Sequence, residues 1–530
     1  MRQIFLGCSR LRWLAPLLAV LSLGACGVNP VTGKKEIQLI SAEQEIKLGT
    51  ENYAPSRQSQ GGDLLLMPEL SAYVNEVGQR IAKVSDRQLP YEFVVLNSSV
   101  PNAWALPGGK IAVNRGLLTT LENEAELAAV LGHEIVHAAA RHGAKAQERG
   151  TFLQVGMVAA QIGLAMGDAN PNVGNLVVQG AGLGAQLFMM KYGREAELEA
   201  DLYGMRYMSK AGYDPGAAIT LQRKFLALSQ KDGRNNQGWL EGLFASHPPS
   251  AERVTRNEQT ATTLQPTGEV GAERYAARLK PLLAAKPAYD LADQALEAAG
   301  KKEFARARSL AAEATRLLPR EARFHQLAGD IEMAEKRSQQ AIPFYEKSIA
   351  LDPNYFAGYL GGGIASYRLG NRSRAEEWLK RSAAMLPTAP ALYYLGSIAK
   401  ERGDIDAAMP LFRSAAQSQS EIGKQAAGEF VTLDLPRNPG NYIAAALQFD
   451  AQGRAMAIVE NRAPIEASAI VITPVRIDAA GRVVEQARPI RIDRTLRSGE
   501  RVVVDAGLGA LTPELLAQLR LRIDAASGPR

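Results

Sequence analysis

The spacing of hydrophobic and polar positions divides the chain into four segments. An unbroken apolar run precedes residue 26, mixed helical and strand-like spacing covers 36–258, a repeated helical pattern covers 288–420, and apolar positions alternate with polar ones over 438–530. Apolar residues three to four positions apart predict helices, and those two apart predict strands. The chain is therefore expected to be multidomain, with an α+β domain, an all-α solenoid and a C-terminal antiparallel β-sandwich.

The N-terminus has the pattern of a secretion signal. A basic start is followed by an apolar run from Trp13 to Ala25, which is too short for the roughly 20 helical residues that cross a bilayer. The run ends in Leu-Gly-Ala before Cys26, and this resembles the bacterial lipobox, in which the cysteine is lipidated after cleavage. We expect a signal peptide over 1–25 and a lipidated tether over 26–35. A plain secretion signal with an incidental thiol is the alternative.

Composition and charge narrow the class of protein. A mean hydropathy of −0.14 argues against a chain that crosses the membrane many times. The net charge of +6 falls to +3 when the three arginines of the leader are removed, and no basic stripe accompanies it, so a nucleic-acid partner is not expected. The two cysteines, Cys8 and Cys26, leave the mature chain without a disulfide pair. Gly27 after the cysteine resembles the signal for outer-membrane sorting, so we expect an outer-membrane lipoprotein facing the periplasm.

Three of the five histidines lie close together, and two of them form the motif His133-Glu134-x-x-His137. Asn123 is a suitable N-cap for a helix through this motif, and the apolar residues around it recur at helical spacing. On a helix both imidazoles lie on one face and can reach one Zn²⁺ ion, while Glu134 is placed to act as the base that activates water. The sequence predicts one zinc ion per chain.

A third ligand is expected from the acidic segment 194–201. Glu197 and Asp201 lie four residues apart and so share a helix face. We interpret Glu197 as the ligand and Asp201 as the carboxylate that orients a ligand histidine. Position alone favours Glu197 over Glu195 and Glu199 only moderately, because an acidic helix face is usually just solvated.

With these motifs, residues 36–258 resemble the HtpX and CAAX prenyl protease family of zinc metallopeptidases, in its BepA/LoiP-like periplasmic branch. The resemblance includes the order of motifs before and after the histidines, among them Gly212-Tyr213-Asp214-Pro215 and His247-Pro248. It implies a gluzincin-type endopeptidase with Glu197 as ligand. It also implies quality control of outer-membrane proteins as the function, with unfolded or misassembled proteins as substrates and the β-barrel assembly machinery as a partner.

Two further segments are candidates for the site. Two glycines precede alternating apolar residues in the first segment, which predicts a strand entered through a turn; an edge strand could bind substrate backbone, whereas the alternative is a plain core strand. The residues of this expected substrate strand are Asn102, Gly108, Gly109, Ile111 and Val113. His247, between Ser246 and two prolines, is expected to approach the metal as a removable plug or an oxyanion donor; the alternative is a structural histidine.

The second half of the chain predicts binding modules. After an expected linker over 259–287, positions such as Ala307, Ala341 and Ala375 recur every 34 residues across 288–420, the period of the tetratricopeptide repeat. Residues 438–530 alternate and contain two hairpin-like turns. Residues 152–166 and 174–190, rich in small apolar side chains, predict a helical hairpin over the active site or a membrane-touching surface. The competing hypothesis for the whole protein is a repeat-based chaperone or scaffold with a latent protease.

Overall fold

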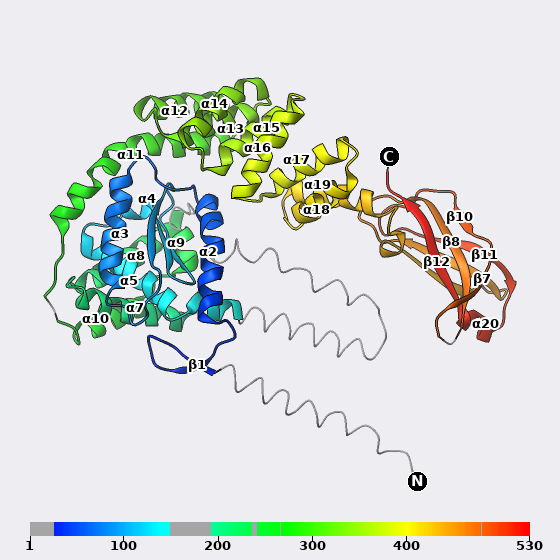
Figure 1. The fold of residues 1–530 in the computed structure, drawn as a ribbon, viewed down its shortest axis with the longest axis horizontal. Coiled ribbons are helices and arrows are strands. Elements are labelled where there is room, and N and C mark those ends of the chain that lie inside the picture. The colour runs from blue at the N-terminus through cyan, green and yellow to red at the C-terminus, as the bar shows by residue number, and fades with distance from the viewer. Residues whose placement is uncertain (1–25, 149–191, 236–240, 266, 479, 530) are drawn as a thin grey trace, which may run out of the picture. The chain divides into compact units, whose positions relative to one another are not determined.

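The computed structural model describes residues 26–148, 192–235, 241–265, 267–478 and 480–529 (Figure 1). The expected signal peptide over 1–25 and the apolar stretches 152–166 and 174–190 lie outside the described residues. Two compact units, 1–355 and 356–530, make up the chain and are considered separately. Within the described residues, every helix is too short or too polar to cross a membrane.

The first unit is built around a small sheet that is buried on both faces. The order of the strands is β3-β5-β4, with β3 parallel and β4 antiparallel to the central β5. One face packs against the tyrosine Tyr53 of helix α2, and the other faces helices α3 and α5 (Figure 1). The elements of this layer are α2 (Ala42–Ser59), α3 (Pro68–Ala82), β3 (Glu92–Leu96), β4 (Ala103–Leu106), β5 (Lys110–Asn114), α4 (Arg115–Leu118) and α5 (Glu124–Ala139).

Helix α5 is buried along its whole length. It begins after Asn123, whose side chain accepts a hydrogen bond from the Glu126 amide, so the cap expected from the sequence is present. All 16 residues of the helix are buried. Helix α7 (Arg194–Lys210) packs against it, followed by α8 (Gly216–Asn235), α9 (Glu241–Ser246) and α10 (Ala251–Ala261).

Two glycines allow α5 and α7 to approach closely. A Cβ atom on Gly132 would lie 3.1 Å from the Gly204 carbonyl oxygen, and one on Gly204 would lie 3.0 Å from the His133 amide nitrogen. Such distances are tighter than ordinary side-chain packing, so a larger residue would push the helices apart. The close approach brings the acidic start of α7 beside the histidines of α5.

Residues 26–35, which are expected to form a lipidated tether, are part of a short hairpin. Strand β1 (Cys26–Val28) pairs antiparallel with β2 (Lys35–Ile37). Between the strands, the buried Asn29 accepts hydrogen bonds from the amides of Val31 and Thr32, at 2.9 and 3.2 Å. The side-chain oxygen thereby closes a turn that composition alone did not reveal.

The expected linker over 259–287 is largely helical. Helix α11 (Ala272–Gly300) runs through it without a break at Pro281 or Pro287. The physical reason is burial: Tyr275 and Leu279 belong to the hydrophobic core that also contains residues of α5. Tertiary packing therefore overrides the proline signals that suggested an irregular segment.

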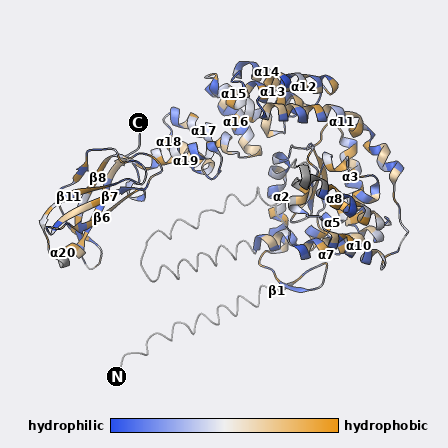
Figure 2. Cartoon of the chain, turned by 180° about the vertical axis from the view of Figure 1, so that it is seen from behind, coloured by the Kyte–Doolittle hydropathy of each residue, from blue (hydrophilic) through white to orange (hydrophobic). Residues whose placement is uncertain are grey.

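Helical hairpins follow α11 in both units. The second helices of successive hairpins begin at residues 304, 338, 372 and 405, close to the expected period. Figure 2 shows hydrophilic and hydrophobic residues side by side along these helices, as expected where only one face of each helix is packed. The helices are α12 (Phe304–Leu317), α13 (Ala322–Ala334), α14 (Ser338–Leu351), α15 (Phe356–Arg368), α16 (Arg372–Met385), α17 (Ala389–Glu401), α18 (Ile405–Ala415) and α19 (Glu421–Asp434).

The C-terminal strands form two antiparallel sheets with a shared hydrophobic cluster. One sheet has the order β11-β7-β6, and the other has β10-β8-β12 with β9 beside β8. Buried residues of both sheets, including Val459 and Ile472, belong to one cluster. The elements are η4 (Pro439–Asn441), β6 (Ile443–Phe449), β7 (Arg454–Asn461), β8 (Ser468–Ile477), β9 (Val483–Gln486), β10 (Ile490–Ile492), β11 (Arg501–Ala510), α20 (Pro513–Gln518) and β12 (Leu519–Ser527).

Candidate metal centre

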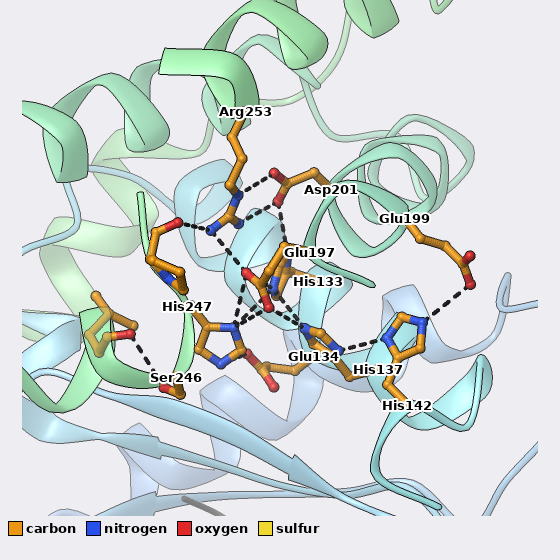
Figure 3. Close-up of polar contacts among 12 residues, drawn as sticks. His133, Glu134, His137, His142, Glu197, Glu199, Asp201, Ser246, His247 and Arg253 are labelled. Carbon is orange, nitrogen blue, oxygen red and sulfur yellow. Dashed lines mark hydrogen bonds and ion pairs between the residues drawn. The ribbon is translucent and has the colours of Figure 1, made fainter. Parts of the chain in front are cut away.

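Four side chains converge at the contact between α5 and α7 (Figure 3). One donor atom from each of His133, His137, Glu197 and His247 lies within 4.8 Å of the others. The Nε2 atoms of His133 and His137 are 2.9 Å apart, and Glu197 Oε1 lies 3.3 Å from His137 Nε2 and 3.1 Å from His247 Nδ1. All three residues expected to bind the metal, together with His247, thus meet at one point.

The segment after α9 supplies His247. The His247 amide donates a hydrogen bond to the Leu243 carbonyl at 2.8 Å, which fixes the backbone just where the helix ends. The imidazole is 7% exposed. Its Nδ1 lies 3.1 Å from Glu197 Oε1 and 3.3 Å from His133 Nε2, so the ring contacts both α5 and α7.

Asp201 lies where the sequence interpretation placed it. Its Oδ1 is 2.9 Å from His133 Nδ1, one turn along α7 from Glu197. Arg253 of α10 donates to both oxygens of Asp201 at 2.7 Å and forms an ion pair with Glu197 at 2.9 Å. No role for Arg253 is expected from the sequence. Here it compensates the charge of two buried carboxylates.

Two more contacts to His137 were not assigned from the sequence. His142, which follows the end of α5, has its Nδ1 2.8 Å from His137 Nδ1. Tyr192 stacks on the His137 ring, with centroids 3.9 Å apart and an interplanar angle of 15°. The cluster of three histidines within ten residues was the available signal for His142, whereas Tyr192 had none. Glu199, a rejected ligand candidate, contacts His142 rather than the four donor atoms, and Glu195 is exposed.

The electrostatics around His133 favour positive charge. Burial alone would lower the pKa of His133, but the charges of Glu197 and Asp201 outweigh it and raise that pKa to about 10. Burial acts against ionisation of Glu197, yet His247 and His133 hold the pKa of this carboxyl well below its usual range. A pocket that stabilises a protonated imidazole and an ionised carboxylate together is equally suited to a cation.

Glu134 is the one acidic group of the motif that stays outside the donor cluster. It is 2% exposed, and burial raises its pKa. Its Oε1 lies 3.5 Å from His247 Nε2, while its Oε2 is buried without a hydrogen-bond partner among the described residues. A buried carboxylate oxygen with no partner is costly, and it is available to a proton or a water molecule that enters the site.

The expected substrate strand needs correction. Ile111 and Val113 belong to β5, whose two edges are paired with β3 and β4, so this strand has no free backbone to offer a substrate. Both side chains are fully buried in the core. Gly108 and Gly109 form the turn that joins β4 to β5, with φ angles of 79° and 87°. Asn102 accepts a hydrogen bond from the Asn114 amide at 2.9 Å and precedes β4.

The strand with an unpaired edge beside the site is β4. Among the described residues its outer edge pairs with no further strand. Its first residue, Ala103, lines a cavity together with His133, Glu134 and His247. The twofold alternation of the segment was visible in the sequence, but which of the two strands lies at the edge depends on pairing with β3, which alternation does not report.

The donor set fits a zinc ion. Imidazole nitrogens and one carboxylate are ligands that Zn²⁺ prefers. A metal-binding histidine typically donates a hydrogen bond from its other ring N–H to a carboxylate, and His133 Nδ1 lies 2.9 Å from Asp201 Oδ1. The convergence of the four donor atoms within 4.8 Å matches one ion in size. The structure therefore provides a group of side chains able to hold a metal ion.

Comparison with known proteins agrees with this geometry. Residues 68–261 match Peptidase family M48, and residues 322–355 match the tetratricopeptide repeat. The chain is 27% identical over 265 residues to the Beta-barrel assembly-enhancing protease of Escherichia coli (strain K12), which covers 48% of this chain and 53% of that protein. It is 32% identical over 233 residues to the Mitochondrial metalloendopeptidase OMA1 of Schizosaccharomyces pombe, covering 43% of this chain and 65% of the relative.

Among solved structures, the MamA protein is similar over 29% of this chain and 84% of its own, with a TM-score of 0.25 and 19% identity. The chain spans about half the length of the bacterial relatives it matches. The family match covers the residues that carry the histidine motif and the acidic segment of α7. This match confirms the resemblance inferred from the motifs: residues 68–261 form a domain similar to peptidase family M48, and a tetratricopeptide repeat follows at 322–355.

Proposed function

We propose that the protein is a zinc-dependent endopeptidase of gluzincin type that acts in the periplasm on misfolded or misassembled outer-membrane proteins. The observation that carries this proposal is the convergence of His133, His137, Glu197 and His247 beside the unpartnered oxygen of Glu134. The name of the Escherichia coli relative supports the class of client. The lipobox-like end of the leader supports attachment to the outer membrane through Cys26.

His133, His137 and Glu197 would hold the zinc ion, which supplies Lewis-acid activation of a peptide carbonyl and of water. The remaining chemistry belongs to the chain. Glu134 Oε2 is free to take a proton from water and to return it to the leaving amine, and its raised pKa suits a group that must both accept and donate near neutral pH. Asp201 keeps the proton of His133 on Nδ1, so that Nε2 is bare and available as a ligand.

Substrate backbone is proposed to add to the outer edge of β4, which pairs with no strand among the described residues. The four residues of β4 are buried, so an added strand would have to displace what covers them. Strand addition provides main-chain hydrogen bonds without strong sequence preference, which suits a protease for unfolded chains. Ala103 is small and lines the same cavity as Glu134, so an added strand would pass close to the base.

The proposal is tested with full-length protein, casein and a chelator. Chelation should abolish hydrolysis and zinc should restore it. Glu134→Gln should retain one zinc per chain, because Glu134 lies outside the donor cluster, yet lose activity by about 10²–10⁴-fold, the usual contribution of a general base. Casein hydrolysis that survives both the chelator and Glu134→Gln would refute a metallopeptidase at this site. Full zinc content in His137→Ala would refute the ligand set.

His247 is proposed to keep the protease latent. Its Nδ1 lies 3.1 Å from Glu197 Oε1, and a fourth protein donor closes the position that a catalytic zinc needs for water. As a removable plug, His247→Ala should raise basal casein hydrolysis at equal zinc occupancy. As a transition-state donor, the same change should lower turnover by about 10²-fold or more. A tenfold or greater loss would contradict the plug.

The tetratricopeptide repeats are proposed to recruit clients or the β-barrel assembly machinery. Repeats of this kind present extended surfaces for protein partners. A second candidate function, a repeat-based chaperone whose protease is held shut, is favoured by the same position of His247. Suppression of client aggregation by Glu134→Gln, undiminished from the wild type, would favour the chaperone; aggregation prevented only by the active enzyme would favour the protease.

A further inference from the structure

A chain of hydrogen bonds leads away from the second candidate ligand, His137. If His137 Nε2 is bare toward the metal, its ring proton lies on Nδ1, which is 2.8 Å from His142 Nδ1. His142 Nδ1 must then accept, so the proton of this second ring lies on Nε2, 3.3 Å from Glu199 Oε1. Figure 3 shows the two rings and Glu199 in line. Each partner thus has one defined donor or acceptor role.

The far end of this chain is Asn29, in the hairpin that follows Cys26. Asn29 Nδ2 donates to the same Glu199 Oε1 at 3.1 Å, across 170 residues of sequence. The amide is oriented by its own turn, because its oxygen accepts from the amides of Val31 and Thr32. Asn29 is 2% exposed. The side-chain nitrogen therefore has one orientation, and that orientation serves Glu199.

The hairpin segment is also attached to the turn that carries His142. Lys145 forms an ion pair with Glu36 of β2 at 2.8 Å. Arg141, directly before His142, donates to the Ile40 carbonyl at 2.5 Å. Contacts on both sides of His142 thus connect the turn after α5 to residues 36–40, so the segment that begins at Cys26 is built into this side of the centre.

The two ligand histidines are supported in parallel ways. With Nε2 directed to the metal, His133 donates a hydrogen bond from its Nδ1–H to Asp201, which Arg253 holds in place. In the same way His137 donates a hydrogen bond from its Nδ1–H to His142, and the carboxylate at the end of that path is Glu199. Second partners of this kind fix the tautomer and the orientation of a metal-binding imidazole and raise its basicity.

We propose that His142, Glu199 and Asn29 are positioning residues for His137, so that the hairpin directly after Cys26 is a structural part of the metal centre. The inference rests on the proposed function, because it takes His137 as a zinc ligand. It goes further in assigning the N-terminal hairpin a role in metal affinity. Displacement of this hairpin should loosen the metal without altering any of the ligands.

The test uses zinc affinity of the full-length protein, measured by competition with a chelator at pH 7.5. Asn29→Asp keeps the oxygen that closes the turn but replaces the donor to Glu199 by a second carboxylate oxygen. Asn29→Asp and Glu199→Ala, made as separate single variants, should each weaken zinc binding by about 10–100-fold. Glu199→Gln, which retains an acceptor for His142, should recover most of the loss. Glu195→Ala is the matched control, because this glutamate of the same helix is exposed and its ion pair in the described part of the chain is with Arg194.

The thermal unfolding of the metal-free proteins separates positioning from general stability. If Glu199 only positions His142, Glu199→Ala and Glu199→Gln should both unfold at the wild-type temperature without metal. Their zinc affinities should nevertheless differ, with Glu199→Ala binding more weakly than Glu199→Gln. Zinc affinity within twofold of wild type in both Asn29→Asp and Glu199→Ala would overturn it, as would a loss of affinity matched by an equal loss of metal-free stability in every variant. Full zinc content in His137→Ala contradicts the metal site itself and is recognised separately.

Discussion

Helices α5 and α16 are similar in length but differ in how much of their surface is buried. All 16 residues of α5 are buried, including His133, Glu134 and His137. In α16, by contrast, the buried residues are Ala375, Leu379 and Ser382, which lie on one face, and most of the others are polar. The first helix has no face left for solvent, whereas the second packs through a narrow stripe.

The difference separates two ways of carrying function. In a helix buried on every side, each polar group needs a specific partner, because an unsatisfied buried group costs about 1–3 kcal/mol or more. The partners then form a network in which few substitutions are tolerated. In a helix packed on one face, small residues such as Ala375 support the stack while the exposed face can vary. Substitutions in the metal centre are therefore expected to destabilise the protein, whereas most substitutions on the exposed faces of the repeats should be tolerated.

The sharpest test compares two arginines on α10. Arg253 is 5% exposed and pairs with Asp201 and Glu197, whereas Arg256, one turn later, is exposed. Arg253→Ala leaves two buried carboxylates without their cation and should lower the free energy of unfolding by about 3–5 kcal/mol in the metal-free protein. Arg256→Ala should change it by less than about 0.5 kcal/mol. Urea unfolding measures both, and equal effects would remove the proposed contrast.

The second test asks whether the repeats bind clients. Tyr394 of α17 is half-buried, and its ring lies 5.0 Å from that of Tyr367 on α15, the first helix of the preceding hairpin. Tyr394→Ala should weaken binding of a denatured outer-membrane β-barrel protein by about thirtyfold, as for a central interface aromatic. Hydrolysis of a short peptide should not change.

Lys380→Ala on α16 serves as the control for this test, because its side chain is 66% exposed. Fluorescence titration of the labelled β-barrel protein measures all three affinities. Equal affinity of the wild type and Tyr394→Ala would show that this aromatic pair is not a client-binding surface.

The smallest effects come from two glycines and should differ in sign. Gly204 of α7 faces the backbone of α5, so Gly204→Ala should overpack the contact and cost about 1–3 kcal/mol. Gly428 of α19 has open space where a Cβ would be placed, so Gly428→Ala should stabilise by about 0.5–1 kcal/mol through helix propensity. Thermal unfolding of both variants measures the signs. Destabilisation by Gly428→Ala would contradict the idea that a helix packed on one face tolerates change.

Local signals in the sequence were sufficient for much of this architecture. The metal motif is a short spacing on one helix, so the order of residues alone identifies His133, Glu134 and His137 as candidates. The repeat period is likewise local, and the helices from α12 to α18 follow it closely. Glu197 required a resemblance to a family, because charge and spacing alone did not distinguish it from its neighbours.

Contacts between distant segments could not be predicted from the sequence. The bond from Asn29 to Glu199 joins residues 170 positions apart, and no periodicity reports such a pair. The edge position of β4 rather than β5 depends on the parallel partner β3. The helical path through Pro281 and Pro287 depends on burial of Tyr275 in a core made by other segments. In each instance tertiary packing decided what local pattern left open.

Helix α11 has a practical consequence for dissecting the protein. Its first half contributes Tyr275, Leu279 and Leu282 to the core of the peptidase domain, and its second half contributes Ala295 and Ala298 to the first repeat hairpin. If the chain were divided into two fragments anywhere inside this helix, each fragment would expose apolar residues that are buried in the intact protein. Trypsin should therefore cleave the folded chain slowly at Arg278, and fragments expressed separately should aggregate unless they are produced together.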